Sequence, residues 1–142
     1  MHTPAPPSPP AVGWPVRLLA AATVGYTGVL VWATHHPKPE RIVGTNPPSD
    51  KLLHVAAYAV LGTLVALTLG AAGRLSLRSG LAVAAGLAAF AALDEATQPL
   101  PWFRRSADPL DWVFDVAGVA LGLAAGAVAA RAVQSLTGRR RQ

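Results

Sequence analysis

The chain has 142 residues, of which 52% are hydrophobic and only 13% are charged, with a formal net charge of +5 and no cysteine. This composition is too apolar for an ordinary soluble domain and predicts a membrane protein. The missing cysteines exclude disulfides, zinc–thiolate sites and thiol nucleophiles. The positive charge does not indicate nucleic-acid binding, because the basic residues are scattered at the ends of apolar runs, apart from Arg139, Arg140 and Arg141.

The chain begins with a segment unlike the rest. Its first thirteen residues are rich in proline and have no periodicity, which predicts a disordered lead-in. The apolar run from Val16 to about Thr34 then has the length of a transmembrane helix, because about 20 residues at ~1.5 Å each cross the ~30 Å hydrocarbon core. Pro37 and Pro39 end this run. A secretory signal peptide is the alternative, but no A-x-A cleavage site follows.

Three further apolar runs predict three more spans, from Leu52 to about Ala72, from about Ser79 to Gln98 and from about Leu110 to Ala132. The third run must reach Gln98 to be long enough, and Pro99 then ends it. The predicted fold is therefore all-α, a polytopic membrane protein with four transmembrane helices in an antiparallel bundle. This domain covers residues 14–133, and a basic cytoplasmic tail follows at 134–142.

The basic residues predict how the spans are oriented. Seven fall on one side of the four-span arrangement, namely Arg17, Arg74, Arg78, Arg131, Arg139, Arg140 and Arg141. The five others share their side with all seven acidic residues: Lys38, Arg41, Lys51, Arg104 and Arg105. This excess predicts a multi-pass membrane protein with both termini in the cytoplasm and the acids facing outward. The abundance of Ala, Gly, Pro and Arg is attributed to a GC-rich bacterial genome, so the expected location is the bacterial cytoplasmic (inner) membrane.

Polar side chains recur at the outer ends of the last three spans. In SDKLLHVAAY, Asp50 can cap the second span, and Lys51, His54 and Tyr58 follow at spacings of three and four, on one helix face. The third span ends in Asp94, Glu95 and Gln98, which lie one helical turn or less apart. Charge inside hydrocarbon costs several kcal/mol, so these groups must be solvated, paired or functional.

The fourth span begins with a helix-start signal. Asp108 is predicted to cap it, with Pro109 at the first helical position, Asp111 at the third and Asp115 one turn deeper. The same face continues as Gly118, Gly122 and Gly126, a GxxxGxxxG ladder that lets another helix approach closely, either within the chain or in a homo-oligomer. The three span ends are therefore expected to converge in one outward-facing polar pocket, with Arg104 and Arg105 above it.

These motifs resemble a known family. The order Asp50-Lys51-x-x-His54-x-x-x-Tyr58, then Asp94-Glu95-x-x-Gln98, then Arg105 with Asp111, Asp115 and Gly118, is similar to the VanZ-like family of bacterial membrane proteins. The resemblance covers about Asp50 to Gly126. Members often carry Gly before the arginine and Asn at the position of Asp115, so the chain departs from the pattern twice. The resemblance implies an integral membrane protein, associated through the founding member with reduced sensitivity to the glycopeptide antibiotic teicoplanin.

The polar residues divide into two predicted roles. His54, Asp94, Glu95 and Asp111 are the candidate catalytic group, which could act as an acid/base site or hold a divalent metal of open identity. The candidate ligand-binding residues are Asp50, Lys51, Tyr58, Gln98, Arg105 and Asp115. In the alternative interpretation, the same residues form a structural ion network, with Lys51 paired to Asp50 or Glu95. His35 and His36 are interpreted as interfacial polar residues.

Three functions are weighed on this basis. The leading hypothesis is a pocket that binds or modifies an envelope lipid or cell-wall precursor, with no nucleic-acid partner and with catalysis left open. The second is a non-enzymatic membrane scaffold or partner subunit. The third, a proton-coupled exporter, is disfavoured because the first span has no acidic residue at its middle and the charges gather at one rim.

Overall fold

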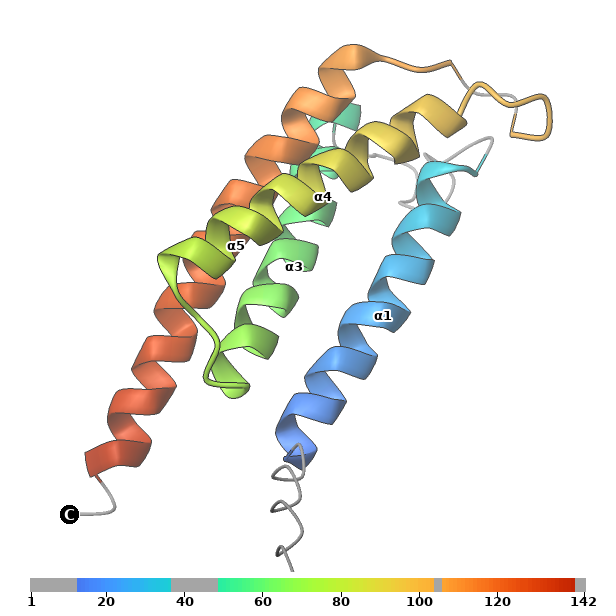
Figure 1. Cartoon of the computed structure of the whole chain (residues 1–142). Helices are drawn as coiled ribbons and strands as arrows, with labels where there is room; N and C mark the ends of the chain where they lie inside the picture. The colour runs from blue at the N-terminus through green and yellow to red at the C-terminus, as the bar shows by residue number, and fades with distance from the viewer. Residues whose placement is uncertain (1–12, 37–48, 104–105, 140–142) are drawn as a thin grey trace, which may run out of the picture.

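The computed structural model describes residues 13–36, 49–103 and 106–139, which form four helices (Figure 1). These are α1 (Trp14–Thr34), α3 (Asp50–Ala71), α4 (Leu77–Thr97) and α5 (Pro109–Arg139). Each is long and apolar enough to cross a membrane, and successive helices run in opposite directions. The predicted all-α, four-span antiparallel architecture is confirmed. Residues 1–12 of the predicted lead-in, Pro37, Pro39, Arg104, Arg105, Arg140 and Arg141 lie outside the described residues.

Much of the helix surface is apolar and faces outward. Large hydrophobic side chains are exposed on every helix, for example Val24 on α1, Val60 on α3, Leu81 on α4 and Val128 on α5. Exposed apolar area on this scale would promote aggregation in water, whereas lipid chains cover it in a bilayer. The surface therefore agrees with the lengths of the four helices.

The tightest packing joins α3 to α5, because glycines remove the side chains between them. A Cβ added at Gly118, Gly122 or Gly126 would overlap the part of α3 around Val55, Ala59 and Thr63. Gly62 on α3 is the reciprocal case, since a Cβ there would meet the Val119 carbonyl oxygen at 2.8 Å. The GxxxGxxxG ladder thus serves packing within the chain. The predicted homo-oligomer through the same glycines would have to displace α3.

The other two helices are held less closely. The main partner of α1 is α3, and the main partner of α4 is α5, while α3 and α4 touch only slightly. The Tyr26 hydroxyl on α1 donates a hydrogen bond to the Ala57 carbonyl oxygen on α3 at 2.9 Å. Trp112 Nε1 on α5 donates a hydrogen bond to the Ala88 carbonyl oxygen on α4, also at 2.9 Å. The bundle is therefore a central α3–α5 pair flanked by α1 and α4.

Local signals decide where the helices begin. Ser49, not Asp50, caps α3, because its side chain accepts a hydrogen bond from the Leu52 N–H. The predicted Asp50 cap is wrong: Asp50 is the first helical residue and its carboxylate is free to face His54. The predicted start of α5 is confirmed, since Asp108 Oδ1 accepts the Leu110 N–H at 2.9 Å.

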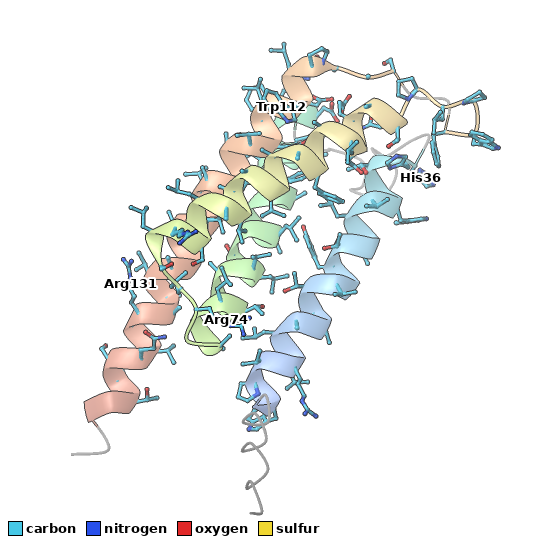
Figure 2. All side chains as sticks on the ribbon, viewed as in Figure 1. His36, Arg74, Trp112 and Arg131 are labelled. Atoms are coloured by element: carbon cyan, nitrogen blue, oxygen red, sulfur yellow. The ribbon has the colours of Figure 1, made fainter. Side chains whose placement is uncertain are left out.

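Charged groups separate along the bundle. Arg17 lies in the first turn of α1, and Arg74 lies between α3 and α4. Arg78 lies in the first turn of α4, and Arg131 in the second half of α5. Figure 2 shows Arg74 and Arg131 toward one end of the bundle, with His36 and Trp112 at the other. The described acidic residues gather at this second end, where α1 and α4 finish and α3 and α5 begin. We call it the polar end.

Candidate functional site

Two groups of polar side chains lie at the polar end. The first, the His54 cluster, joins the beginnings of α3 and α5 and consists of Asp50, Lys51, His54, Asp108, Asp111 and Asp115. The second, the Asp94 cluster, joins the end of α4 to α1 and α3 and consists of Thr34, His35, Tyr58, Asp94 and Thr97. Each cluster brings together residues from separate helices, as the convergence of the span ends predicts.

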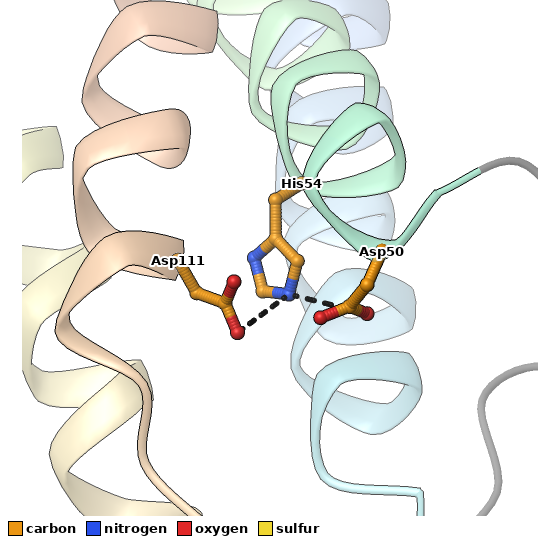
Figure 3. A group of neighbouring side chains, drawn as sticks. All are labelled: Asp50, His54 and Asp111. Atoms are coloured by element: carbon orange, nitrogen blue, oxygen red, sulfur yellow. Dashed lines mark ion pairs between the residues drawn. The ribbon is translucent and has the colours of Figure 1, made fainter.

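His54 is the centre of the first cluster. Its imidazole is buried, and Nδ1 lies 2.8 Å from Asp115 Oδ1, one helical turn above the glycine ladder. The other nitrogen, Nε2, faces Asp111 Oδ2 at 3.6 Å and Asp50 Oδ1 at 3.9 Å (Figure 3). The close approach of α3 and α5 places these groups so near to one another. His54 is thus surrounded by three carboxylates from two helices.

Lys51 is already paired inside the same cluster. Its ammonium donates a hydrogen bond to Asp108 Oδ2 at 2.5 Å and another to Asp111 Oδ1. Hydrogen bonds from Lys51 and from the Leu110 N–H lower the pKa of Asp108, which lies in the loop before α5. The predicted partners of Lys51, Asp50 and Glu95, are therefore wrong. The ammonium therefore uses two of its three donors within the protein.

Glu95 and Gln98 fasten the loop before α5 to the end of α4. Glu95 Oε1 accepts the Asp108 N–H at 2.5 Å, and Oε2 accepts a hydrogen bond from Gln98 Nε2 at 2.7 Å. Gln98 is fully buried, yet its Oε1 accepts no hydrogen bond from the residues described. Buried acceptors are nearly always satisfied, so an oxygen without a partner among the described residues is unusual.

Asp94 receives two hydrogen bonds. Thr34 Oγ1 on α1 donates to Oδ1 at 3.1 Å, and the Tyr58 hydroxyl on α3 donates to Oδ2 at 3.2 Å. His35 Nδ1 lies 3.6 Å from the same Oδ1, and His35 Nε2 lies 2.9 Å from Thr97 Oγ1. The interpretation of His35 as an interfacial residue is wrong. It is buried, packs edge-on against the ring of Phe103, and belongs to the site.

A cleft of about 630 Å³ opens beside the Asp94 cluster, between α1 and α4. Its apolar lining comes from Val31, Trp32, Phe90, Leu93, Leu100 and Phe103. His35, His36, Asp94 and Thr97 add polar groups at the end of the two helices. Two of its lining residues, Trp32 and Leu93, are exposed on the outer surface of the bundle, so the cleft is open to the surroundings.

The predicted catalytic group is divided between these places. His54 and Asp111 lie together, Asp94 belongs to the second cluster, and Glu95 is held by the Asp108 backbone. Within the described ranges, neither a hydrogen bond nor an ion pair joins His54 to Asp94 or Glu95. Of the predicted ligand-binding residues, Asp50, Lys51 and Asp115 surround His54, Tyr58 contacts Asp94 and Gln98 contacts Glu95. Arg105 lies outside the described residues.

Thr34 and His35 are site residues that the sequence reasoning missed. The signal for them was a Thr-His pair at the end of the first span, on the same side of the membrane as the acidic residues. Neighbouring charges alone could not show whether the pair faces lipid or the bundle.

No family model, curated protein or solved structure matches this chain. The VanZ-like resemblance therefore stays a prediction from its motifs. The function is therefore inferred from the geometry of the two clusters and the cleft.

Proposed function

We propose that this chain is a VanZ-like protein of the bacterial inner membrane that binds an envelope lipid or a lipid-linked cell-wall precursor. The hydrocarbon chain of the ligand occupies the cleft between α1 and α4, and its headgroup reaches the polar end. The observation that carries this proposal is the cleft itself, whose apolar walls lead to Asp94, His35 and Thr97. A concave, mainly apolar site with a few convergent polar groups is typical of small-molecule binding.

The bilayer makes a lipid the natural occupant. The cleft lies between two helices of transmembrane length and is open at the side, so a hydrocarbon chain can enter without crossing water. Exposed side chains such as Trp32 and Leu93 would otherwise leave a poorly filled groove in the hydrocarbon. A chain lying along them restores the van der Waals contacts that such a groove loses.

The charges at the polar end favour a particular headgroup. Six of the seven acidic residues of the chain lie there: Asp50, Asp94, Glu95, Asp108, Asp111 and Asp115. The ammonium of Lys51 is hydrogen-bonded to two of them, Asp108 and Asp111, and the others leave an excess of acceptor oxygens at this end. A headgroup carrying hydroxyl, amide or ammonium donors therefore fits better than a bare phosphate. Sugar-bearing cell-wall precursors provide such donors.

The same charges support an orientation. The arginines of the opposite end would lie in the cytoplasm with both termini, as the excess of basic residues there favours. The polar end would then face the outer side of the inner membrane, where cell-wall precursors are used.

Filling the cleft tests lipid binding. Leu93→Trp places an indole in the cleft, whereas Leu121→Trp on α5 is a matched control at a similarly exposed leucine that does not line it. We expect native mass spectrometry of the detergent-purified protein to show a retained lipid in the wild type and in Leu121→Trp, and on the order of tenfold less in Leu93→Trp. Equal lipid retention in all three proteins would contradict the proposal.

A scaffold role is the second candidate, because Lys51, Glu95 and Asp94 already have partners within the chain. Asp94→Asn separates the two functions. If the protein binds a headgroup, this variant loses the retained lipid and any teicoplanin tolerance that the wild type confers, while its thermal stability in detergent falls no further than that of Tyr58→Phe, which loses a hydrogen bond to the same carboxylate. If the network is only structural, stability and tolerance fall together.

A further inference from the structure

We propose that Asp50, His54 and Asp111 bind a divalent transition-metal ion at the polar end. One ligand atom from each of the three residues lies within 4.8 Å of the others (Figure 3). This site is formed by α3 and α5, whereas the cleft lies between α1 and α4. The inference therefore does not depend on lipid binding.

The imidazole of His54 is prepared to act as a ligand. The side chain is only 6% exposed, and its Nδ1 is hydrogen-bonded to Asp115 Oδ1 at 2.8 Å. That bond turns Nε2 toward Asp50 and Asp111, at distances beyond hydrogen-bond reach, and Nε2 has no hydrogen-bond partner in the described part of the chain. Metal-bound histidines typically donate their other ring N–H to a carboxylate in this way. Asp115 is accordingly a positioning residue.

The spacing of the ligand atoms suits a small ion after a modest contraction. With metal–ligand bonds of ~2.1 Å in a tetrahedron, the ligand atoms lie roughly 3.4 Å apart. Nε2 is already 3.6 Å from Asp111 Oδ2 and 3.9 Å from Asp50 Oδ1. The Asp50 side chain is half exposed and can rotate inward, so the buried ligands need not move far.

The charges of the His54 cluster also favour a bound cation. The ammonium of Lys51 donates hydrogen bonds to Asp111 Oδ1 and to Asp108. The other oxygen of Asp111, Oδ2, remains directed at His54. Asp50 and Asp115 complete a group of three carboxylates around the ring of His54. Burying such like charges side by side is unfavourable unless a counter-charge offsets them. A divalent ion between Asp50 and Asp111 supplies that charge.

The ligand types indicate which metals fit. One imidazole with two carboxylates favours ions such as Zn²⁺ or Mn²⁺ over Ca²⁺ and Mg²⁺, which prefer oxygen ligands alone. Three protein ligands leave further coordination positions for water or for a polar group of a bound molecule. The exposed Asp50 lies at the membrane edge and gives the ion a route from solution.

The test is metal analysis of the full chain purified in detergent without chelators. We expect stoichiometric Zn²⁺ or Mn²⁺ by plasma mass spectrometry, and re-binding of the same ion after it has been stripped. His54→Ala and Asp111→Asn should weaken binding at least on the order of 100-fold, and Asp115→Asn by roughly tenfold, as loss of an outer-sphere partner does. His35→Ala is the matched control, a buried histidine of the Asp94 cluster that should keep the metal.

Asp50→Asn shows whether metal loss can be separated from misfolding, because this exposed side chain can be changed without disturbing the core. It should elute as the wild type does on size exclusion and still lose most of its affinity for the ion. The proposal is overturned if the wild type carries no metal and binds neither Zn²⁺ nor Mn²⁺ when titrated, which would make the cluster an ion-pair network around a charged His54. Equal metal loss in His35→Ala and His54→Ala would overturn it as well.

Discussion

The two halves of the bundle are built differently. In the α3–α5 pair, glycines bring two backbones into contact. The charged groups at the polar end of this pair contact one another directly, as in the 2.8 Å distance between His54 Nδ1 and Asp115 Oδ1. The flanking helices α1 and α4 have mostly larger side chains between them, leave a cleft, and meet chiefly through the Asp94 cluster. The comparison teaches that close packing and an open groove can share one membrane bundle when the helical glycines that lie against a neighbouring helix belong to one helix pair.

The difference has a physical origin in the bilayer. Lipid chains are as apolar as leucine, so helices gain little by burying leucine and depend on close packing and hydrogen bonds instead. The α3–α5 pair has both, whereas α1 and α4 contact the pair less extensively. Leu30 of α1 and Ala91 of α4 join the buried apolar core, and hydrogen bonds such as Tyr26 to Ala57 and Trp112 to Ala88 add to this packing. We therefore expect substitutions in the tight pair to cost more than equivalent ones in the flanking helices.

The largest effect is expected at Gly122. A Cβ there would overlap the Ala59 backbone, which cannot move without separating α3 from α5. Gly122→Ala should lower the free energy of unfolding by about 3 kcal/mol, an overpacking cost. Thermal unfolding of the detergent-purified protein measures it.

Gly86→Ala on α4 is the matched control for this change. It is also a mid-helix glycine, but nothing lies within 4 Å of an added Cβ. Alanine favours the helix over glycine, so this variant should be as stable as the wild type or more so by about 0.5–1 kcal/mol. Similar losses in both variants would show that the two halves are equally packed.

A smaller effect is expected where the two halves meet. Tyr58→Phe keeps the buried ring but removes the hydroxyl that donates to Asp94, leaving Thr34 as a remaining donor. Side-chain hydrogen bonds within membranes contribute about 0.6 kcal/mol on average and up to about 1.7 kcal/mol, and we expect the upper value here because the acceptor is a buried carboxyl group.

Tyr26→Phe provides the comparison for Tyr58→Phe. Its hydroxyl donates to the Ala57 carbonyl oxygen, a backbone group within α3, so its loss should cost only about 0.5 kcal/mol. Chemical unfolding of both variants in mixed micelles measures the difference. A larger loss in Tyr26→Phe would mean that the docking of α1 matters more than the Asp94 cluster.

Features set by length and local chemistry could be predicted from the sequence. Apolar runs long enough to cross a bilayer predicted the four spans to within two residues at every end but one. The exception is α5, which continues past the predicted end at Ala132 to Arg139, into the segment predicted to be a basic tail. The spacing of Gly118, Gly122 and Gly126 predicted a packed face, and Asp108-Pro109 predicted the start of α5. Each of these depends on one segment at a time, and the convergence of the polar residues at one end then follows from alternating span directions.

Which residues pair across helices could not be predicted in the same way. Successive side chains on a helix point about 100° apart, so a small rotation of α3 decides whether Lys51 meets Asp108 and Asp111 or another acid. The position of α1 against α3 and α4 likewise decides that His35 is buried beside Asp94. Such rotations result from the packing of the whole bundle and leave no pattern within a single span.

The smallest effect is expected at Asp108, a half-exposed residue just before α5, at the polar end of the tight pair. Its hydrogen bond with Lys51 holds the pKa of Asp108 below the ordinary value of 3.8. Because the folded-state pKa is lowered, the pair stabilises the protein above pH 3.8, and this contribution disappears as the pH falls through the lowered value. Asp108→Asn should therefore melt within about 2 °C of the wild type at neutral pH, and the difference should vanish in acid. Melting curves recorded in detergent from neutral pH to about pH 3 measure this difference. A difference that persisted unchanged in acid would mean that the side chain acts as the cap of α5, through Leu110, and not through the Lys51 ion pair.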